Sequence, residues 1–139
     1  MTVEANKELI RRYFESWNAN DVDALDELIA VDAIDHMAYD GQQTGREGYR
    51  DFYRTWHSAF PGFRAVIEDM IAEGDRVATR WTFHGRHLGE YNGIAPTGRD
   101  VTFQAVSIQR IENGIVTEEW YIADNHAFLQ QLTDGGCQG

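Results

Sequence analysis

One aspartate stands at a strand-to-helix junction, where it could act as an acid/base catalyst or as a helix cap. Asp124 follows the aromatic and β-branched run of residues 120–123 and precedes an apolar-periodic segment beginning at Asn125. Alternate residues of a strand share one face, so Trp120, Ile122 and Asp124 lie on the same side. If that side lines a cavity, apolar surroundings raise the pKa of Asp124 toward the range needed to remove a proton beside a carbonyl. The alternative is an N-cap, a common position for Asp.

Histidines supply the other candidate acid/base groups. His36 follows Asp35 in a short extended segment, where its imidazole could carry a proton, hold a substrate oxygen, or simply hydrogen-bond to Asp35. His84 and His87 lie three residues apart across Gly85 at a strand end, a spacing that does not aim two ligands at one metal ion. We therefore predict no metal site and no cofactor.

Aromatic side chains recur at helical or strand spacing. They could line a pocket for a flat hydrophobic substrate, or they could be ordinary core. In a cone-shaped fold both are possible, because the core opens into the cavity. The predicted substrate-binding residues are Tyr13, Trp17, Trp56, Trp81, His87, Phe103 and Trp120.

The elements that must position these residues follow from hydrophobic periodicity. In the first part of the chain, apolar residues recur about every four positions, which indicates helices. From residue 63 onward they recur at every second position, which indicates strands. Asn113-Gly114 is a strong hairpin signal, because both residues tolerate positive φ. We predict helices over residues 3–17, 22–29 and 45–60, a short extended segment over 33–37, a turn around Gly41, strands over 63–72, 76–84, 101–111 and 115–123, and a short final helix. This order predicts a single α+β domain over residues 1–139, with three N-terminal helices packed on a curved, mainly antiparallel sheet that encloses a pocket.

The charge and the cysteine count exclude several kinds of partner. The 139 residues carry a net charge of −11, which argues against nucleic acid and anionic membranes. The single cysteine, Cys137, allows neither an intrachain disulfide nor a cysteine-based zinc site. Because no long apolar run occurs, we expect a cytoplasmic protein.

Several motifs together carry a family resemblance. They are Ala59-Phe60-Pro61-Gly62, Gly74-Asp75-Arg76-Val77, Gly85-Arg86-His87-Leu88-Gly89, Gly93-Ile94-Ala95-Pro96-Thr97-Gly98-Arg99, Arg110-Ile111-Glu112-Asn113-Gly114, and Trp120 and Asp124 ahead of Leu129-Gln130-Gln131-Leu132. In this set the chain resembles the SnoaL-like polyketide cyclases of the nuclear transport factor 2-like superfamily. The resemblance covers nearly the whole chain and implies the same cone-shaped fold.

The resemblance also implies a reaction, a cofactor-free intramolecular aldol closure of a polyketide ester. It places the general acid/base at Asp124 and an assisting histidine at His36. Some relatives are thought to use a second histidine on the strand before the Asn-Gly turn. That strand carries Gln104, Ser107, Gln109 and Arg110 in this chain.

Two alternatives remain open at this point. The same Asp and His could serve an isomerase, a dehydratase or a hydrolase of a small hydrophobic compound. The cone could instead be a non-catalytic binder of a hydrophobic ligand. In each case we expect a small hydrophobic ligand and a homodimer, or a higher homo-oligomer, that covers the open face of the sheet.

Overall fold

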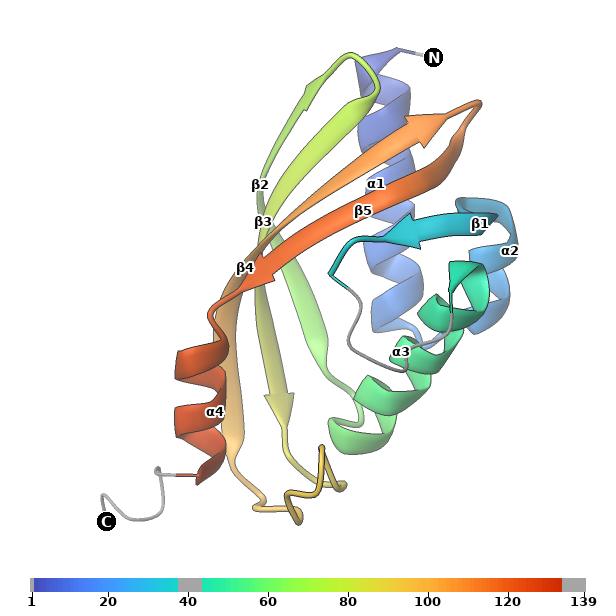
Figure 1. Cartoon of the computed structure of the whole chain (residues 1–139). Helices are drawn as coiled ribbons and strands as arrows, with labels where there is room; N and C mark the ends of the chain where they lie inside the picture. Colours follow the sequence, from blue (N-terminus) through green and yellow to red (C-terminus); the bar gives the residue numbers. More distant parts are fainter. Residues whose placement is uncertain (1, 38–43, 134–139) are drawn as a thin grey trace.

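Helices and one short strand come first in the chain, four longer strands follow, and one helix ends it. The computed structural model describes residues 2–37 and 44–133, so the predicted turn around Gly41 and the cysteine Cys137 lie outside the described residues. The elements in order are α1 (Val3–Asn18), the short 3-10 helix η1 (Val22–Ala24), α2 (Leu25–Leu28), β1 (Ile29–Asp35), α3 (Gly45–Ala59), β2 (Arg64–Glu73), β3 (Arg76–Arg86), β4 (Asp100–Glu112), β5 (Ile115–Ala123) and α4 (Asn125–Thr133) (Figure 1).

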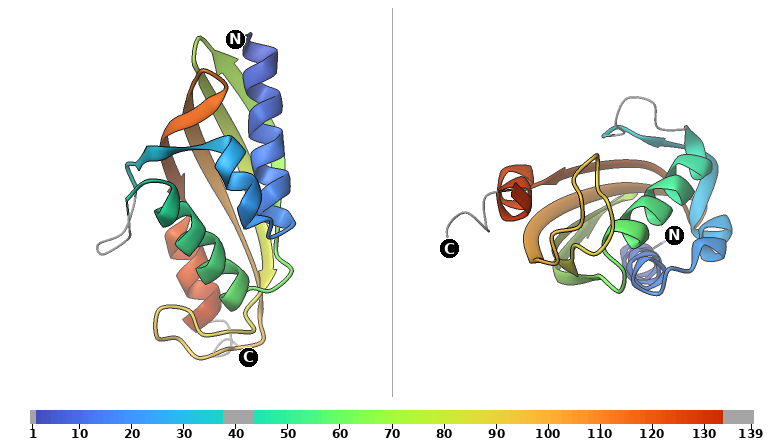
Figure 2. Two further views of the ribbon diagram at one scale, coloured as in Figure 1. Left: turned by 90° about the vertical axis from the view of Figure 1, so that its right-hand side faces the viewer. Right: turned by 90° about the horizontal axis from the view of Figure 1, so that it is seen from below.

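The strands form one mixed sheet in the order β1-β5-β4-β3-β2. The pairs β2-β3, β3-β4 and β4-β5 are antiparallel, whereas β1 pairs with β5 in parallel. The hairpin between β4 and β5 turns at Asn113 and Gly114, whose φ angles are 54° and 76°, as the sequence predicted. The sheet is curved, with α1, α2 and α3 together on one side of it (Figure 2). The predicted α+β cone is confirmed.

The second predicted helix is shorter than expected. Asp21 caps its start, with the carboxylate accepting from the Ala24 amide at 3.3 Å. The helical segment ends at Leu28, and β1 begins at Ile29 rather than near residue 33. The β-branched residues from Ile29 onward favour a strand, and β5 offers an edge with which this segment can pair. The helical period over Ile29 was therefore misleading.

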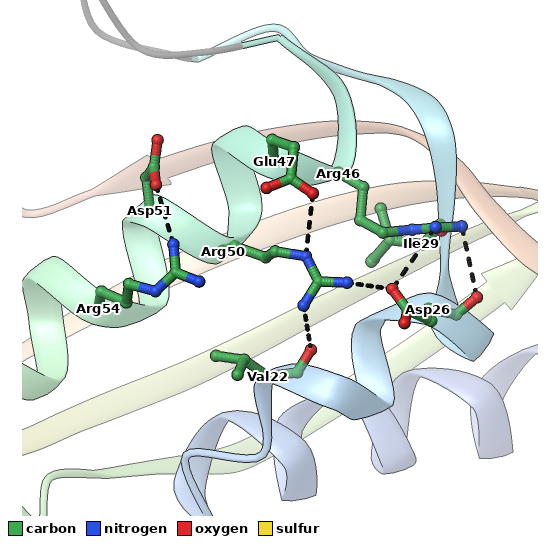
Figure 3. Close-up of polar contacts among 8 residues, drawn as sticks. All are labelled: Val22, Asp26, Ile29, Arg46, Glu47, Arg50, Asp51 and Arg54. Carbon is green, nitrogen blue, oxygen red and sulfur yellow. Dashed lines mark hydrogen bonds and ion pairs between the residues drawn. The ribbon is translucent and has the colours of Figure 1, made fainter.

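Two arginines fasten α3 to the end of α2. Arg46 donates through Nε to the Ile29 carbonyl at 2.9 Å and through Nη2 to the Asp26 carbonyl at 3.3 Å. Arg50 donates to the Val22 carbonyl at 3.3 Å and forms an ion pair with the Asp26 carboxylate (Figure 3). These contacts join α3 to backbone oxygens of η1, α2 and the first residue of β1. They fix the rotation of α3, whose opposite face turns inward.

The helix α1 is fixed against the sheet and α3 by side-chain hydrogen bonds. The Asn18 side chain donates to the Ala65 carbonyl at 3.0 Å and accepts from the Ala65 amide at 2.7 Å, so it replaces a strand partner at the edge of β2. Ser16 and Tyr53 are hydrogen-bonded through their hydroxyls at 2.9 Å, which joins α1 to α3. Among the described residues, no helix has the length and apolar character needed to cross a membrane.

Candidate functional site

An aromatic pocket opens between the helices α1 and α3 and the concave face of the sheet. Its empty space, with the open mouth included, is about 600 Å³. Rings from both helices and from three strands form most of the wall, and two carboxyl groups and one serine interrupt it. The lining residues are Tyr13, Phe14, Trp17, Asp35, Tyr49, Phe52, Trp56, Trp81, Phe83, Phe103, Ser107, Glu119 and Tyr121.

Glu119 is the most perturbed acid of the pocket. Its side chain points inward from β5, and the residue is 8% exposed. Gln109 on the neighbouring strand β4 donates from Nε2 to Glu119 Oε1 at 2.6 Å. Burial raises the pKa of Glu119 to about 8, and the charge of Asp35 adds to the rise, while hydrogen bonds from Gln109 and Tyr13 oppose it. Glu119 is therefore mostly protonated at neutral pH.

Asp35 brings a second carboxyl group to the same wall. The parallel pairing of β1 with β5 sets Asp35 beside Glu119, and the His36 amide donates to the Glu119 carbonyl at 2.9 Å. The Met37 amide donates to Asp35 Oδ1 at 3.0 Å. The charge of Asp35 adds to burial in keeping Glu119 protonated. The pocket wall therefore carries one acid that holds its proton and a second carboxyl group beside it.

The hydroxyl groups around the pocket are neutral at physiological pH. Burial raises the pKa of Tyr49 well above its ordinary range, and it raises the pKa of Tyr121 to about 12. The Trp81 indole donates to Ser107 Oγ at 2.9 Å, which orients that hydroxyl. Within residues 2–37 and 44–133, no group of three or more His, Cys, Asp or Glu side chains is arranged to hold a metal ion. The described part of the pocket wall therefore offers carboxyl groups, hydroxyl groups and aromatic rings to a ligand.

The structure brings several of the predicted substrate-binding residues to this pocket. Tyr13, Trp17, Trp56, Trp81 and Phe103 all lie in its wall. They come from α1, α3, β3 and β4, and each turns an aromatic face or edge toward another ring of the cluster. Trp56, for example, lies 5.5 Å from Phe128 of α4, centroid to centroid. The helical and strand spacings therefore identified the pocket's side of each element.

Asp124 does not line the pocket, which differs from the inward orientation expected from the sequence. The residue is exposed, and the Ala127 amide donates to its Oδ1 at 3.1 Å, which makes it the cap of α4. Asp124 and Ile122 do share a face, but it is the outer one, where Ile122 is 74% exposed. The pleat turns the intervening residues of β5, Glu119 and Tyr121, inward.

His36 and Trp120 also lie on the outer face. Their rings stack at 4.6 Å, and His36 Nε2 lies 2.8 Å from a carboxylate oxygen of Glu118. The Arg76 guanidinium lies 5.4 Å from the Trp120 ring centre. Neither His36 nor Trp120 lies in the pocket wall, so the structure does not bring them together with Glu119 as the sequence led us to expect.

His87 is a buried residue of the loop between β3 and β4, outside the pocket wall. The Thr97 amide donates to His87 Nδ1 at 3.1 Å, so the imidazole ties two parts of this loop together. Its ring lies 5.4 Å from that of Phe60 at the end of α3. The structure therefore places this predicted substrate-binding residue outside the pocket, where it contacts Thr97 and Phe60.

Glu119, Asp35 and Gln109 were missed in the sequence. One signal was present: Glu119 and Tyr121 alternate with Trp120 and Ile122, so one pair had to face inward. Because Trp120 and Ile122 are large and apolar, the sequence suggested that this pair, rather than Glu119 and Tyr121, faces inward. Asp35 could be placed only by knowing that β1 docks beside β5.

The fold and the site together define a class: an α+β cone whose aromatic pocket holds a buried glutamate beside a half-buried aspartate. The profile of the SnoaL-like polyketide cyclase family matches residues 7–132, and the chain belongs to this family. It is 26% identical over 121 residues to the nogalonic acid methyl ester cyclase of Streptomyces nogalater, covering 86% of this chain and 90% of that one.

Solved structures agree with this assignment. TsrD from Streptomyces laurentii superposes with a TM-score of 0.88 at 26% identity, over 96% of this chain and 98% of that chain. IdmH from Streptomyces antibioticus, a candidate polyketide cyclase, superposes with a TM-score of 0.81 at 33% identity, over 91% and 97% of the two chains. Both matches span more than nine tenths of this chain.

Proposed function

We propose that this protein is a cofactor-free acid/base catalyst that closes a ring in a hydrophobic carbonyl compound by an intramolecular aldol reaction. The observation that carries the proposal is Glu119, a buried carboxyl group in an aromatic pocket, whose pKa of about 8 suits proton transfer near neutral pH. The family membership and the name of the Streptomyces nogalater relative support the reaction class.

The two carboxyl groups take different roles. Asp35, the less enclosed one, removes a proton from the carbon beside a carbonyl, and the resulting enolate carbon attacks a second carbonyl of the same molecule. A carbon–carbon bond forms, the attacked carbonyl oxygen becomes an alkoxide, and protonated Glu119 donates its proton to that oxygen. Asp35 then holds the proton taken from the substrate carbon while Glu119 is ionised, and transfer of that proton from Asp35 to Glu119 restores the starting state.

Proton transfer can be tested without knowing the natural substrate. In deuterated buffer, 2-tetralone should exchange its C1 hydrogens faster with the protein than without it, as followed by proton NMR. Asp35→Asn and Glu119→Gln should each slow that exchange by roughly 10²- to 10⁴-fold, the usual contribution of a general acid or base. Asp124→Asn is the matched control and should exchange at the wild-type rate.

Either of two results would contradict the proposal. One is wild-type exchange in Glu119→Gln; the other is loss of exchange in Asp124→Asn with the fold intact. Ring closure itself can then be measured with nogalonic acid methyl ester, the compound in the relative's name. If the wild type cyclises this ester and Asp35→Asn does not, then the proton transfer by Asp35 is also needed for the aldol ring closure.

We also propose that a second copy of the chain covers the outer face of the sheet. Exposed apolar side chains on neighbouring strands form one patch there, consisting of Ile71, Val106, Ile108 and Ile122. The patch is flanked by charges of both signs, with Arg110 2.8 Å from Glu118, so two copies related by a two-fold axis can complement each other.

Sedimentation tests this dimer. It should show a wild-type dimer at micromolar concentration and a folded monomer for Ile122→Glu. A wild-type monomer at that concentration would exclude the proposed dimer.

A further inference from the structure

Trp17 and Tyr49 each bury a polar hydrogen in the pocket wall without a hydrogen-bond partner. Neither the Trp17 indole Nε1 nor the Tyr49 hydroxyl has a partner within the described part of the chain. The two residues are 8% and 3% exposed, and both line the pocket. Buried polar groups are nearly always paired in native structures, because leaving one unpaired is costly. Two such groups in one pocket point to a ligand.

We propose that Trp17 and Tyr49 are recognition residues for a neutral carbonyl oxygen of the substrate. The proposal rests on the proposed function, because it names the substrate class of the same pocket. An indole nitrogen can only donate a hydrogen bond, so the ligand atom at Trp17 must be an acceptor. Tyr49 keeps its hydroxyl proton at physiological pH and serves as a second donor.

The surroundings favour a neutral acceptor over an anionic one. Besides burial, the charge of Asp35 raises the pKa of Tyr49, so a negative ligand group at this place would be repelled as the tyrosinate is, while Glu119 is mostly protonated at neutral pH and offers it no counter-charge. A pure hydrocarbon would leave both donors unpaired. Trp17 stacks on Phe52 with ring centres 5.6 Å apart, which gives this part of the wall a flat shape. A ketone, quinone or ester carbonyl on a flat ring system meets all these conditions.

The two donors and the two carboxyl groups come from different sides of the pocket. Trp17 and Tyr49 belong to the helices α1 and α3, whereas Asp35 and Glu119 belong to β1 and β5. A substrate with one carbonyl held by the helices would therefore present another part of its framework to the acids. This arrangement suits a compound with several carbonyl groups.

The test compares ligands that differ in a single group. Equilibrium dialysis would measure the affinity of the protein for three ligands. They are the ketone 2-acetylnaphthalene, the hydrocarbon 2-isopropenylnaphthalene and the anion 2-naphthoate. In the hydrocarbon, a methylidene group replaces the carbonyl oxygen of the ketone. In the wild type the ketone should bind more tightly than the anion. In Tyr49→Phe and in Trp17→Phe, the ketone-to-hydrocarbon affinity ratio should fall about tenfold. The carbonyl stretch of bound ketone should also move to higher frequency in Tyr49→Phe, since a hydrogen bond is lost.

Tyr53→Phe is the matched control. Its hydroxyl is as buried as that of Tyr49 but is already paired with Ser16, and it lies outside the pocket wall. Tyr53→Phe should lower the melting temperature and keep the affinity ratio, whereas Tyr49→Phe should keep or raise the melting temperature and lose the ratio. An unchanged ratio in Tyr49→Phe would overturn the proposal, as would failure of the wild type to bind the ketone.

This outcome is separable from that of the proposed function. Glu119→Gln should keep the affinity ratio while losing deuterium exchange of 2-tetralone. If exchange survives in Glu119→Gln while the ratio still depends on Tyr49, the acid/base proposal fails and carbonyl recognition stands. If the ratio is insensitive to Trp17 and Tyr49 while exchange depends on Glu119, carbonyl recognition fails alone.

Discussion

Replacing Glu119 with Gln should change how the stability of the fold depends on pH. Burial, with a contribution from Asp35, raises the pKa of Glu119 from 4.5 to about 8 in the folded protein, and unfolding returns it to its ordinary value. Each pKa unit corresponds to about 1.4 kcal/mol, so the whole shift amounts to roughly 5 kcal/mol. Glutamine has nearly the shape of a protonated glutamate and can accept from Gln109, but it has no proton to lose.

The sign follows from counting protons. Below about pH 4.5 both the folded and the unfolded chain hold the Glu119 proton, and the stabilisation is fully present. Between that pH and about pH 8 the unfolded chain releases the proton while the folded chain keeps it, so the free energy of unfolding falls. Above the folded pKa the loss is complete. The wild type should therefore lose roughly 3–4 kcal/mol relative to Glu119→Gln between about pH 5 and about pH 8.

Urea unfolding followed by tryptophan fluorescence measures this difference at each pH. Glu118→Gln is the control on the same strand. A hydrogen bond from His36 lowers the pKa of Glu118, so its contribution is present above its ordinary pKa and is lost as the pH falls, the opposite direction. If the difference between wild type and Glu119→Gln stayed constant across this pH range, the buried-acid assignment would be refuted.

Three further substitutions test the local structure. Asp124→Ala should cost about 1 kcal/mol in urea unfolding, because α4 loses its cap, and should leave 2-tetralone exchange unchanged. Gly89→Ala should destabilise the protein by about 1–3 kcal/mol in thermal unfolding, since an added Cβ would collide with the Ser58 carbonyl oxygen; a neutral effect would show that this loop can move. Arg50→Met should lower stability by about 1 kcal/mol, less at high salt, because it breaks the ion pair with Asp26 and a hydrogen bond to a backbone carbonyl.

The elements could be predicted because their signals are local. Helical periodicity over α1 and α3, alternation over β3 to β5, and the Asn113-Gly114 turn each act within a few residues of the chain. The exception shows the limit of this approach. Ile29 fits a helical face and a strand equally well, and β5, which pairs with it, lies more than eighty residues away in sequence.

The site could be predicted only in part, because alternation tells which residues share a face and not which face is buried. On β5 both faces carry large apolar or aromatic groups, with Trp120 and Ile122 outside and Tyr121 inside. The helices decide the matter: α1 packs on β2 and β3, and α3 packs on β1, so the face they cover becomes the inner one. That choice depends on tertiary packing, which no short window of sequence contains.

The pairing of β1 with β5 connects the fold to the chemistry. β1 is an edge strand, and its parallel register with β5 is what sets Asp35 beside Glu119. A shift of one residue would turn Asp35 outward and bring Ile34 or His36 to the pocket, removing the second carboxyl group. The charge of Asp35 is also one cause of the raised pKa of Glu119. The contacts of Arg46 and Asp26 at the start of β1 therefore help to hold the register on which the proton affinity of Glu119 depends.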